Sequence, residues 1–262
     1  MLILLPPSEG KAAPRRGAQL RPDRWPAPLD VPRLQVLDAL VRLCRDDPEH
    51  AAKVLGLGPS QADEVRRNAD LLHAPAARAD RVYSGVVYEA LDLSGLDPAA
   101  RRRATRWLAI TSSLFGLVRL DEPIPAYRLS GAVTLPGLGA SGGSVAGHWR
   151  RHLDPVVREA LGNGLLVDLR SSTYAAFWRP APDLARRVAV VRVLHEVGGT
   201  RQVVSHFNKA TKGRLVRALL EDGTSPRTPA ALADHLGTLG WKVETGEPTA
   251  RGTQLDVVVT EV

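Results

Sequence analysis

Cysteine is nearly absent from the 262-residue sequence, in which Cys44 is the single example. One cysteine excludes a disulfide within the chain and argues against a zinc site built on cysteine ligands. Cys44 ends the apolar stretch Val41–Cys44, whose spacing is that of a helix. We therefore expect a small buried side chain at this position and not a nucleophile.

Long apolar runs are also missing. The short apolar run at the start of the chain, residues 2–5, stops at Pro6-Pro7 and lacks a basic start. It is too short for a secretory signal or a membrane span. Hydrophobic residues make up 44% of the chain and charged residues 24%, which is ordinary for a globular protein. We expect a cytoplasmic protein without a membrane partner, folded as one domain over residues 1–262.

Lysine is scarce, so most of the positive charge comes from arginine. Lys and Arg together number 35 against 28 Asp and Glu, which gives a formal net charge of +7. A soluble protein this basic often binds a polyanion such as nucleic acid. The alternative is that abundant arginine reflects a GC-rich genome.

Helical and strand-like patterns are mixed along the chain. Helices are predicted at 33–45, 48–55, 60–73, 98–107, 148–161, 207–220 and 229–236. Strands or extended segments are predicted at 2–5, 83–88, 108–111, 126–129, 165–169, 188–194, 202–205, 241–243 and 255–259. The strand pairs within 188–205 and 241–259 favour antiparallel pairing. The pattern predicts an α+β (mixed α/β) fold, a mixed β-sheet flanked by helices.

Two predicted helices within residues 48–73 are joined by Gly56-Leu57-Gly58, a pattern that resembles a helix-hairpin-helix element. Glycine permits positive φ and close approach of another backbone. The next helix, with Ser60 as its N-cap, offers free N–H groups to a phosphate. Cations near the turn are available for further phosphates, namely Lys53, Arg66 and Arg67. We expect DNA to bind here; the alternative is an ordinary tight turn between packed helices.

A second cluster of polar residues follows the predicted buried strand 165–169, which itself carries Asp168. Ligand sites in α/β proteins often lie at the carboxyl ends of strands. A buried Asp168 requires a partner, for which Arg170 and Lys209 are candidates, or it acts as a general base. We take Asp168, Ser171 and Tyr174 as catalytic candidates. The alternative is a capping cluster that starts the next turn.

Three cations, Lys209, Lys212 and Arg214, lie near the start of the helix predicted at 207–220. Positive charge is unfavourable at a helix N-terminus, because the helix dipole is positive there. The three cations therefore indicate an anionic partner, and all are DNA-binding candidates. Lys209 is also a catalytic candidate. The alternative is a solvated basic face.

Two shorter segments complete the proposed cleft. Ser8 and Lys11 follow the first strand without the glycine spacing of a P-loop, and we take both as catalytic candidates. Arg128 is suited to clamp a phosphate or a carboxylate and is a DNA-binding candidate. His148 and His152 lie four residues apart but lack a third ligand, so we expect no metal and no cofactor.

Seven segments match one known family in order and approximate spacing. They are residues 1–7, Tyr83–Tyr88, Ser113–Arg119, Pro125–Leu129, His148-Trp149, Asp168–Tyr174 and Ser205–Gly213. Together they resemble the YaaA family and extend over nearly the whole chain. The resemblance implies a single α+β body that binds DNA through a helix-hairpin-helix and a basic cleft. It also implies a role in limiting oxidative DNA damage and free iron during peroxide stress.

Three departures mark a divergent branch of that family. Ser8-Glu9-Gly10-Lys11 replaces the family's Ala-Lys-Thr, Thr173 replaces a glutamate, and His206 replaces an aromatic residue.

The leading hypothesis is a DNA-binding protein of the peroxide stress response that docks the backbone of duplex or branched DNA. The competing hypothesis is an enzyme that acts on a nucleotide or nucleobase in the same polar cleft. A base-flipping activity would reconcile the two hypotheses, since the DNA-binding hairpin would deliver a base to the cleft. A third is a partner-binding stress protein whose basic surface is incidental. No motif predicts base-specific readout.

Overall fold

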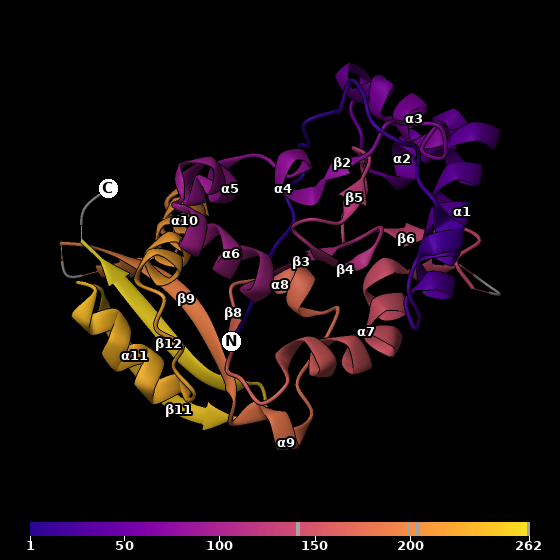
Figure 1. Cartoon of the computed structure of the whole chain (residues 1–262). Coiled ribbons are helices and arrows are strands. Elements are labelled where there is room, and N and C mark those ends of the chain that lie inside the picture. The colour runs from indigo at the N-terminus through magenta and orange to yellow at the C-terminus, as the bar shows by residue number, and fades with distance from the viewer. Residues whose placement is uncertain (140–141, 199, 203–204, 261–262) are drawn as a thin grey trace.

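The computed structural model describes residues 1–139, 142–198, 200–202 and 205–260. Its centre is an eight-stranded sheet in the order β11-β12-β9-β8-β1-β3-β4, with β10 paired to β9 (Figure 1). The strands are β1 Leu2–Leu5, β3 Leu108–Ser112, β4 Gly116–Arg119, β8 Leu166–Asp168, β9 Val188–Val197, β10 Thr200–Gln202, β11 Lys242–Thr249 and β12 Gly252–Val259. The predicted mixed sheet flanked by helices is confirmed.

Parallel pairing dominates the middle of this sheet, where β1 pairs with β3 on one side and with β8 on the other. Strands β8 and β9, and β9 and β12, are also parallel. All four residues of β1 are buried, as parallel strands covered on both faces require. The antiparallel pairs are β3–β4, β9–β10 and β11–β12, and the last two confirm the antiparallel pairing predicted from the sequence.

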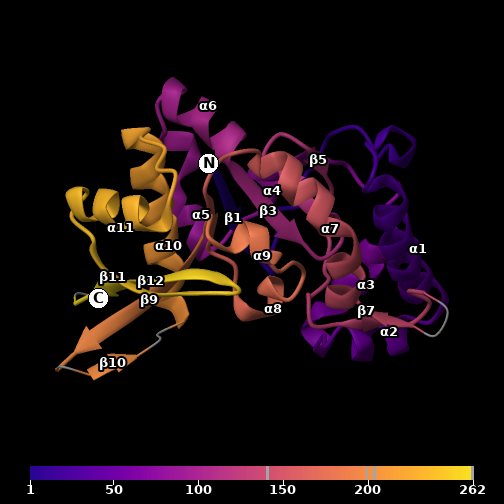
Figure 2. The same cartoon turned by 90° about the horizontal axis from the view of Figure 1, so that it is seen from below.

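Helices cover the sheet, and some of them extend the molecule beyond it at one end. They are α1 Asp30–Asp46, α2 Pro48–Val54, α3 Ala62–Ala69, α4 Ala79–Val82, α5 Val86–Leu91, α6 Pro98–Trp107, α7 Val145–Leu161, α8 Ser172–Ala175, α9 Pro182–Ala185, α10 Ser205–Asp222 and α11 Pro229–Thr238. Helix α6 packs on β1 and β3, α7 on β4, and α11 on β9, β11 and β12. Both views place α1–α3 at one end of the molecule and α11 with β11 at the other (Figures 1 and 2).

Short two-stranded sheets join the connecting segments. Strand β2, Ala77–Arg78, pairs with β5, Pro123–Ile124, and β6, Thr134–Leu135, pairs with β7, Gly143–Ser144.

Cys44 is buried in α1, as expected, and burial raises the pKa of its thiol to about 11. None of the helices that the structure describes is long and apolar enough to cross a membrane.

The crossing of α10 and α5 explains one glycine of the segment 205–213. A Cβ on Gly213 would lie 2.4 Å from the carbonyl oxygen of Val87, so only glycine allows the two helices to approach this closely. The close crossing fixes α10 beside α5. It thereby sets the position of Lys212, one residue before the glycine.

Several element predictions were wrong. Residues 83–88 form no strand: Gly85, with φ of +89°, precedes α5, whose buried residues Val87, Tyr88 and Leu91 have helical spacing. Residues 126–129, predicted to be extended, belong to no strand that the structure describes; the backbone of Arg128 bonds instead to the side chain of Asn68. The strand expected at 202–205 is limited to β10, which ends at Gln202; residues 203 and 204 lie outside the described residues, and α10 begins at Ser205.

Candidate functional site

The sheet topology identifies one position where ligands are expected to bind. After β1 the chain continues to β3, and after β8 it continues to β9, on opposite sides of the β1–β8 pair. In open α/β sheets, ligands bind outside the carboxyl ends of strands at such a switch point. The segments that leave these two strand ends are Ser8–Lys11 and Leu169–Tyr174. We use the name switch-point site for Ser8, Glu9, Lys11, Arg128, Tyr174 and Lys212.

The segment after β1 is held beside the chain around Tyr83. Lys11 forms an antiparallel bridge with Tyr83, and the Ala12 amide donates to the carbonyl of Val82 at 2.9 Å. The Ser8 hydroxyl accepts a hydrogen bond from the Ser84 amide at 3.1 Å. These contacts fix the backbone on both sides of Lys11.

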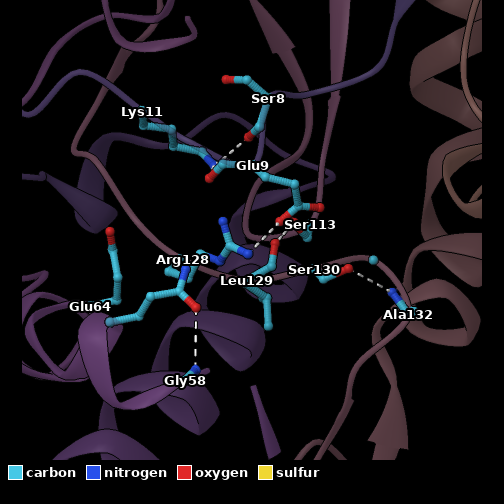
Figure 3. A network of polar contacts seen from close by, with 12 residues as sticks. Ser8, Glu9, Lys11, Gly58, Glu64, Ser113, Arg128, Leu129, Ser130 and Ala132 are labelled. Atoms are coloured by element: carbon cyan, nitrogen blue, oxygen red, sulfur yellow. Dashed lines mark hydrogen bonds and ion pairs between the residues drawn. The ribbon is translucent and has the colours of Figure 1, made fainter. Parts of the chain in front are cut away.

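The Lys11 ammonium is placed between backbone carbonyls and two aromatic rings. Its Nζ donates to the Ser8 carbonyl at 2.8 Å (Figure 3) and to the Glu9 carbonyl at 3.5 Å. It lies 4.0 Å from the centre of the Tyr127 ring and 5.5 Å from that of Tyr83. Both tyrosines are buried, and their hydroxyls bond to each other at 3.0 Å. The Tyr127 hydroxyl also bonds to Ser112, at the end of β3, which fixes the ring beneath the amine.

The pKa of Lys11 is far below that of an ordinary lysine. Burial lowers it, the acids Glu9 and Glu64 oppose the shift, and the charge of Arg128 adds to it, with a result of about 7. At neutral pH a substantial fraction of this side chain is therefore a neutral amine with a free lone pair.

Glu9 connects three parts of the switch-point site. Arg128 Nη2 lies 3.4 Å from one carboxylate oxygen, and the Tyr174 hydroxyl donates to the other at 3.5 Å. Burial, followed by the negative charge of Glu9, raises the pKa of Tyr174, so this phenol stays protonated at neutral pH. Sequence reasoning treated Glu9 as part of a polar segment but did not select it as a site residue.

Asn68 of α3 holds the backbone of Arg128. Its amide donates to the Arg128 carbonyl at 2.7 Å and its side-chain oxygen accepts from the Arg128 amide at 2.9 Å. Asn68 is fully buried, and sequence reasoning missed it. The available indication was a polar residue three positions after Val65, on the apolar face of a helix. Through Asn68, the helix after the glycine turn is bonded to the switch-point site.

Asp168 forms a buried ion pair with Arg170, one of the two partners considered for it. The guanidinium donates to both carboxylate oxygens, at 2.8 and 2.6 Å. Burial alone would raise the pKa of Asp168, but Arg170, aided by Lys212, holds it below its usual range. A carboxylate so firmly ionised and paired is a poor general base.

The other candidates of the chain's second half are divided between the site and the surface. Lys212 Nζ donates to the carbonyl of Leu169 at 2.8 Å, at the end of β8, and burial lowers the pKa of this lysine. Lys209 and Arg214 are exposed on α10. Ser171 is exposed at the N-cap position of α8, where its side chain makes no capping bond.

The glycine turn differs in detail from the prediction. Gly56 has φ of +64°, as expected for a turn glycine, but Pro59–Gln61 forms a 3-10 turn, so α3 starts at Ala62. Its N-cap is Gln61 and not Ser60, because the 3-10 turn delays the start of the α-helix by one residue. Arg66 pairs with Asp63, and Arg67 pairs with Glu64, while Lys53 is exposed. The helix-hairpin-helix assignment stays a prediction.

A cavity of about 460 Å³ lies elsewhere, beside Pro26–Leu29 and α7, and Arg33, Arg119, Glu122 and Glu159 line it. No candidate residue of the sequence analysis lines this cavity. Its two arginines are matched by two glutamates, so it is not the basic cleft that was predicted. Within the described ranges, no group of three or more His, Cys, Asp or Glu residues is arranged to hold a metal ion.

Comparison with known proteins places the chain in a family. The family described as peroxide stress protein YaaA matches residues 1–245. A UPF0246 protein of Streptomyces coelicolor is 52% identical, covering 100% of both chains. A UPF0246 protein of Corynebacterium efficiens is 40% identical, covering 94% of this chain and 96% of the relative. The chain therefore belongs to the YaaA family of peroxide stress proteins.

Proposed function

We propose that the protein binds duplex or branched DNA by its phosphate backbone at residues 53–66 and presents it to the switch-point site, during peroxide stress. One observation carries the proposal: Asn68 joins α3 to Arg128 by two hydrogen bonds. The charge of Glu64, in the first turn of α3, also acts on the pKa of Lys11, so a phosphate bound at this end of the helix would lie near the polar groups at the end of β1 (Figure 3).

The surface of the turn supports this proposal. Gly56 and Gly58 are exposed, and a Cβ added to either would meet nothing within 4 Å, so a phosphate has open access to the backbone. Lys53 is exposed at the end of α2, and the whole chain carries a net charge of +7. The exposed Lys209 and Arg214 of α10 offer further contacts to a polyanion.

Fluorescence anisotropy with a short duplex and a four-way junction, titrated at several salt concentrations, tests the proposal. We expect affinity to fall steeply with salt, because bound phosphates release counterions. Lys53→Glu should weaken binding and flatten the salt dependence. Lys242→Glu is the matched control, since it makes the same charge change on β11 at the other end of the molecule. No affinity at low salt, or equal losses in both variants, would refute the proposal.

A second candidate function, an enzyme acting on a nucleotide or nucleobase, is favoured by the state of Lys11. A partly neutral lysine beside an arginine is typical of nucleophilic or basic catalysis. Asp168→Ala would be a poor test of the two functions. It breaks a buried ion pair, so a loss of activity could come from a loss of stability. Lys11→Met does: an enzyme loses turnover and keeps most of its DNA affinity, whereas a pure binding protein has no turnover to lose.

A further inference from the structure

We propose that Lys11 is a nucleophile that forms an imine with the aldehyde of a phosphorylated deoxyribose, such as an abasic nucleotide in DNA. The inference rests on the proposed function for the DNA source of the aldehyde. Three observations carry it: the neighbours of the amine, the cation beside it, and its place at the switch point of the sheet.

The neighbours of the amine leave its lone pair available. Lys11 Nζ donates to the carbonyl of Ser8 at 2.8 Å and to that of Glu9 at 3.5 Å, and it faces the Tyr127 and Tyr83 rings. Arg170, in contrast, is engaged by two carboxylate oxygens at the end of the next strand. Desolvation next to another cation is the standard way in which proteins activate a lysine amine, and Arg128 is that cation here.

A second group is positioned for the phosphate. Arg128 contacts Glu9 through one ion pair at 3.4 Å, longer than the 2.6 Å of the Asp168–Arg170 pair, and 22% of its side chain is exposed. This guanidinium is therefore free to bind a phosphate oxygen in place of Glu9. The exposed glycine turn is connected to the same arginine through Asn68.

The proposed step balances without an oxidant, a reductant or a cofactor. The neutral amine adds to the aldehyde carbon, and a carbon–nitrogen bond forms. The carbonyl oxygen then leaves as water with both hydrogens of the amine, and the product is the neutral imine. Tyr127 and Tyr83 hold the amine in place and exclude water from one side of it.

Reductive trapping tests the proposal. The scarcity of lysine makes this test specific, because few other amines can compete with Lys11. The competing amines are Lys53, Lys209, Lys212, Lys242 and the terminus of Met1, whose pKa is also lowered by burial. The protein is incubated with a duplex that contains one abasic site, or with deoxyribose 5-phosphate, and with cyanoborohydride, and the modified peptide is identified by mass spectrometry. We expect the adduct at Lys11, at least about tenfold more than at any other amine.

Variants provide the controls. Lys11→Arg, which keeps the positive charge, should abolish the adduct, whereas Lys242→Arg should leave it unchanged. Adducts at Met1 or other lysines, or none at all, would overturn the proposal even where anisotropy shows that the duplex binds. An adduct at Lys11 with deoxyribose 5-phosphate but no affinity for DNA would keep the role of Lys11 and refute the proposed function instead.

Discussion

Asp168 lies at the carboxyl end of β8, and Lys11 lies beyond the carboxyl end of the neighbouring parallel strand β1. The structure stabilises the charged form of Asp168 but destabilises that of Lys11. Asp168 is buried against a guanidinium that contacts both its oxygens, and its pKa is lowered. Lys11 has two backbone carbonyls and two tyrosine rings around its amine, and its pKa falls to about 7.

The difference shows what a partner does for a buried charge. An ion pair with full hydrogen bonding keeps a charge in place, so the Asp168–Arg170 pair contributes a rigid strand end. A cation buried without such a partner gives up its proton more easily, so the Lys11 ammonium loses its proton near neutral pH. The four predictions below test this comparison.

The largest effect is expected for Asp168→Ala. Removing the carboxylate leaves Arg170 charged and buried without its partner, which should lower the free energy of unfolding by about 3–5 kcal/mol. Urea denaturation measures this loss. Asp256→Ala is the control, since it breaks the more exposed Arg192–Asp256 pair and should cost no more than about 1 kcal/mol. Equal losses in the two variants would show that Asp168 and Arg170 are not a structural pair.

Asn68→Ala should rank second. It leaves the amide and the carbonyl of Arg128 without their partners, which should cost about 1–3 kcal/mol. It should also weaken DNA binding, because Arg128 loses its connection to α3. Gln61→Ala removes an exposed bond to the Gly58 amide and serves as the control for stability. If Asn68→Ala is as stable as this control, α3 and the site are not coupled.

The titration of Lys11 should make stability depend on pH. Its pKa is about 7 in the folded protein and about 10.4 in an unfolded chain, so between these values the unfolded state binds more protons. The free energy of unfolding should therefore rise between pH 7.5 and pH 8.5 in the wild type relative to Lys11→Met, by at most about 1.4 kcal/mol over that one pH unit. Parallel curves for the two proteins would mean that burial does not depress this pKa.

The smallest effect is expected at an exposed ion pair. Arg66 and Asp63 pair on the surface of α3, where water screens both charges. Asp63→Ala should change the free energy of unfolding by less than about 1 kcal/mol, as measured by urea denaturation. A loss comparable to that of Asp168→Ala would show that burial is not what separates the strand-end pair from a surface pair.

Much of the fold was predictable, because local patterns encode it. Leu2–Leu5, Pro98–Trp107 and Val188–Val197 were found close to their observed bounds, since an apolar run, a proline start or a valine-rich stretch is decided by its own residues. The strand predicted at residues 83–88 was wrong because Val86, Val87 and Tyr88 favour strands locally. The approach of α10 and the positive φ of Gly85 select a helix instead.

The site was predictable in part. Polar residues after the strands ending at Leu5 and Asp168 were singled out from sequence, because strand ends are where α/β proteins bind ligands. The roles of Glu9 and Asn68 were not predictable from the sequence, since each is defined by partners more than fifty residues away.

The sequence by itself determined most strands of the central sheet, most helices, the scarcity of lysine and the excess of positive charge, because these depend on residue type and spacing along the chain. Only the tertiary structure decided that β1 and β8 are neighbours. That pairing places Lys11 beside tyrosines and an arginine while giving Asp168 its bidentate partner. The free energy of a charge depends on how deeply it is buried and on what faces it, and neither is a local property of the chain.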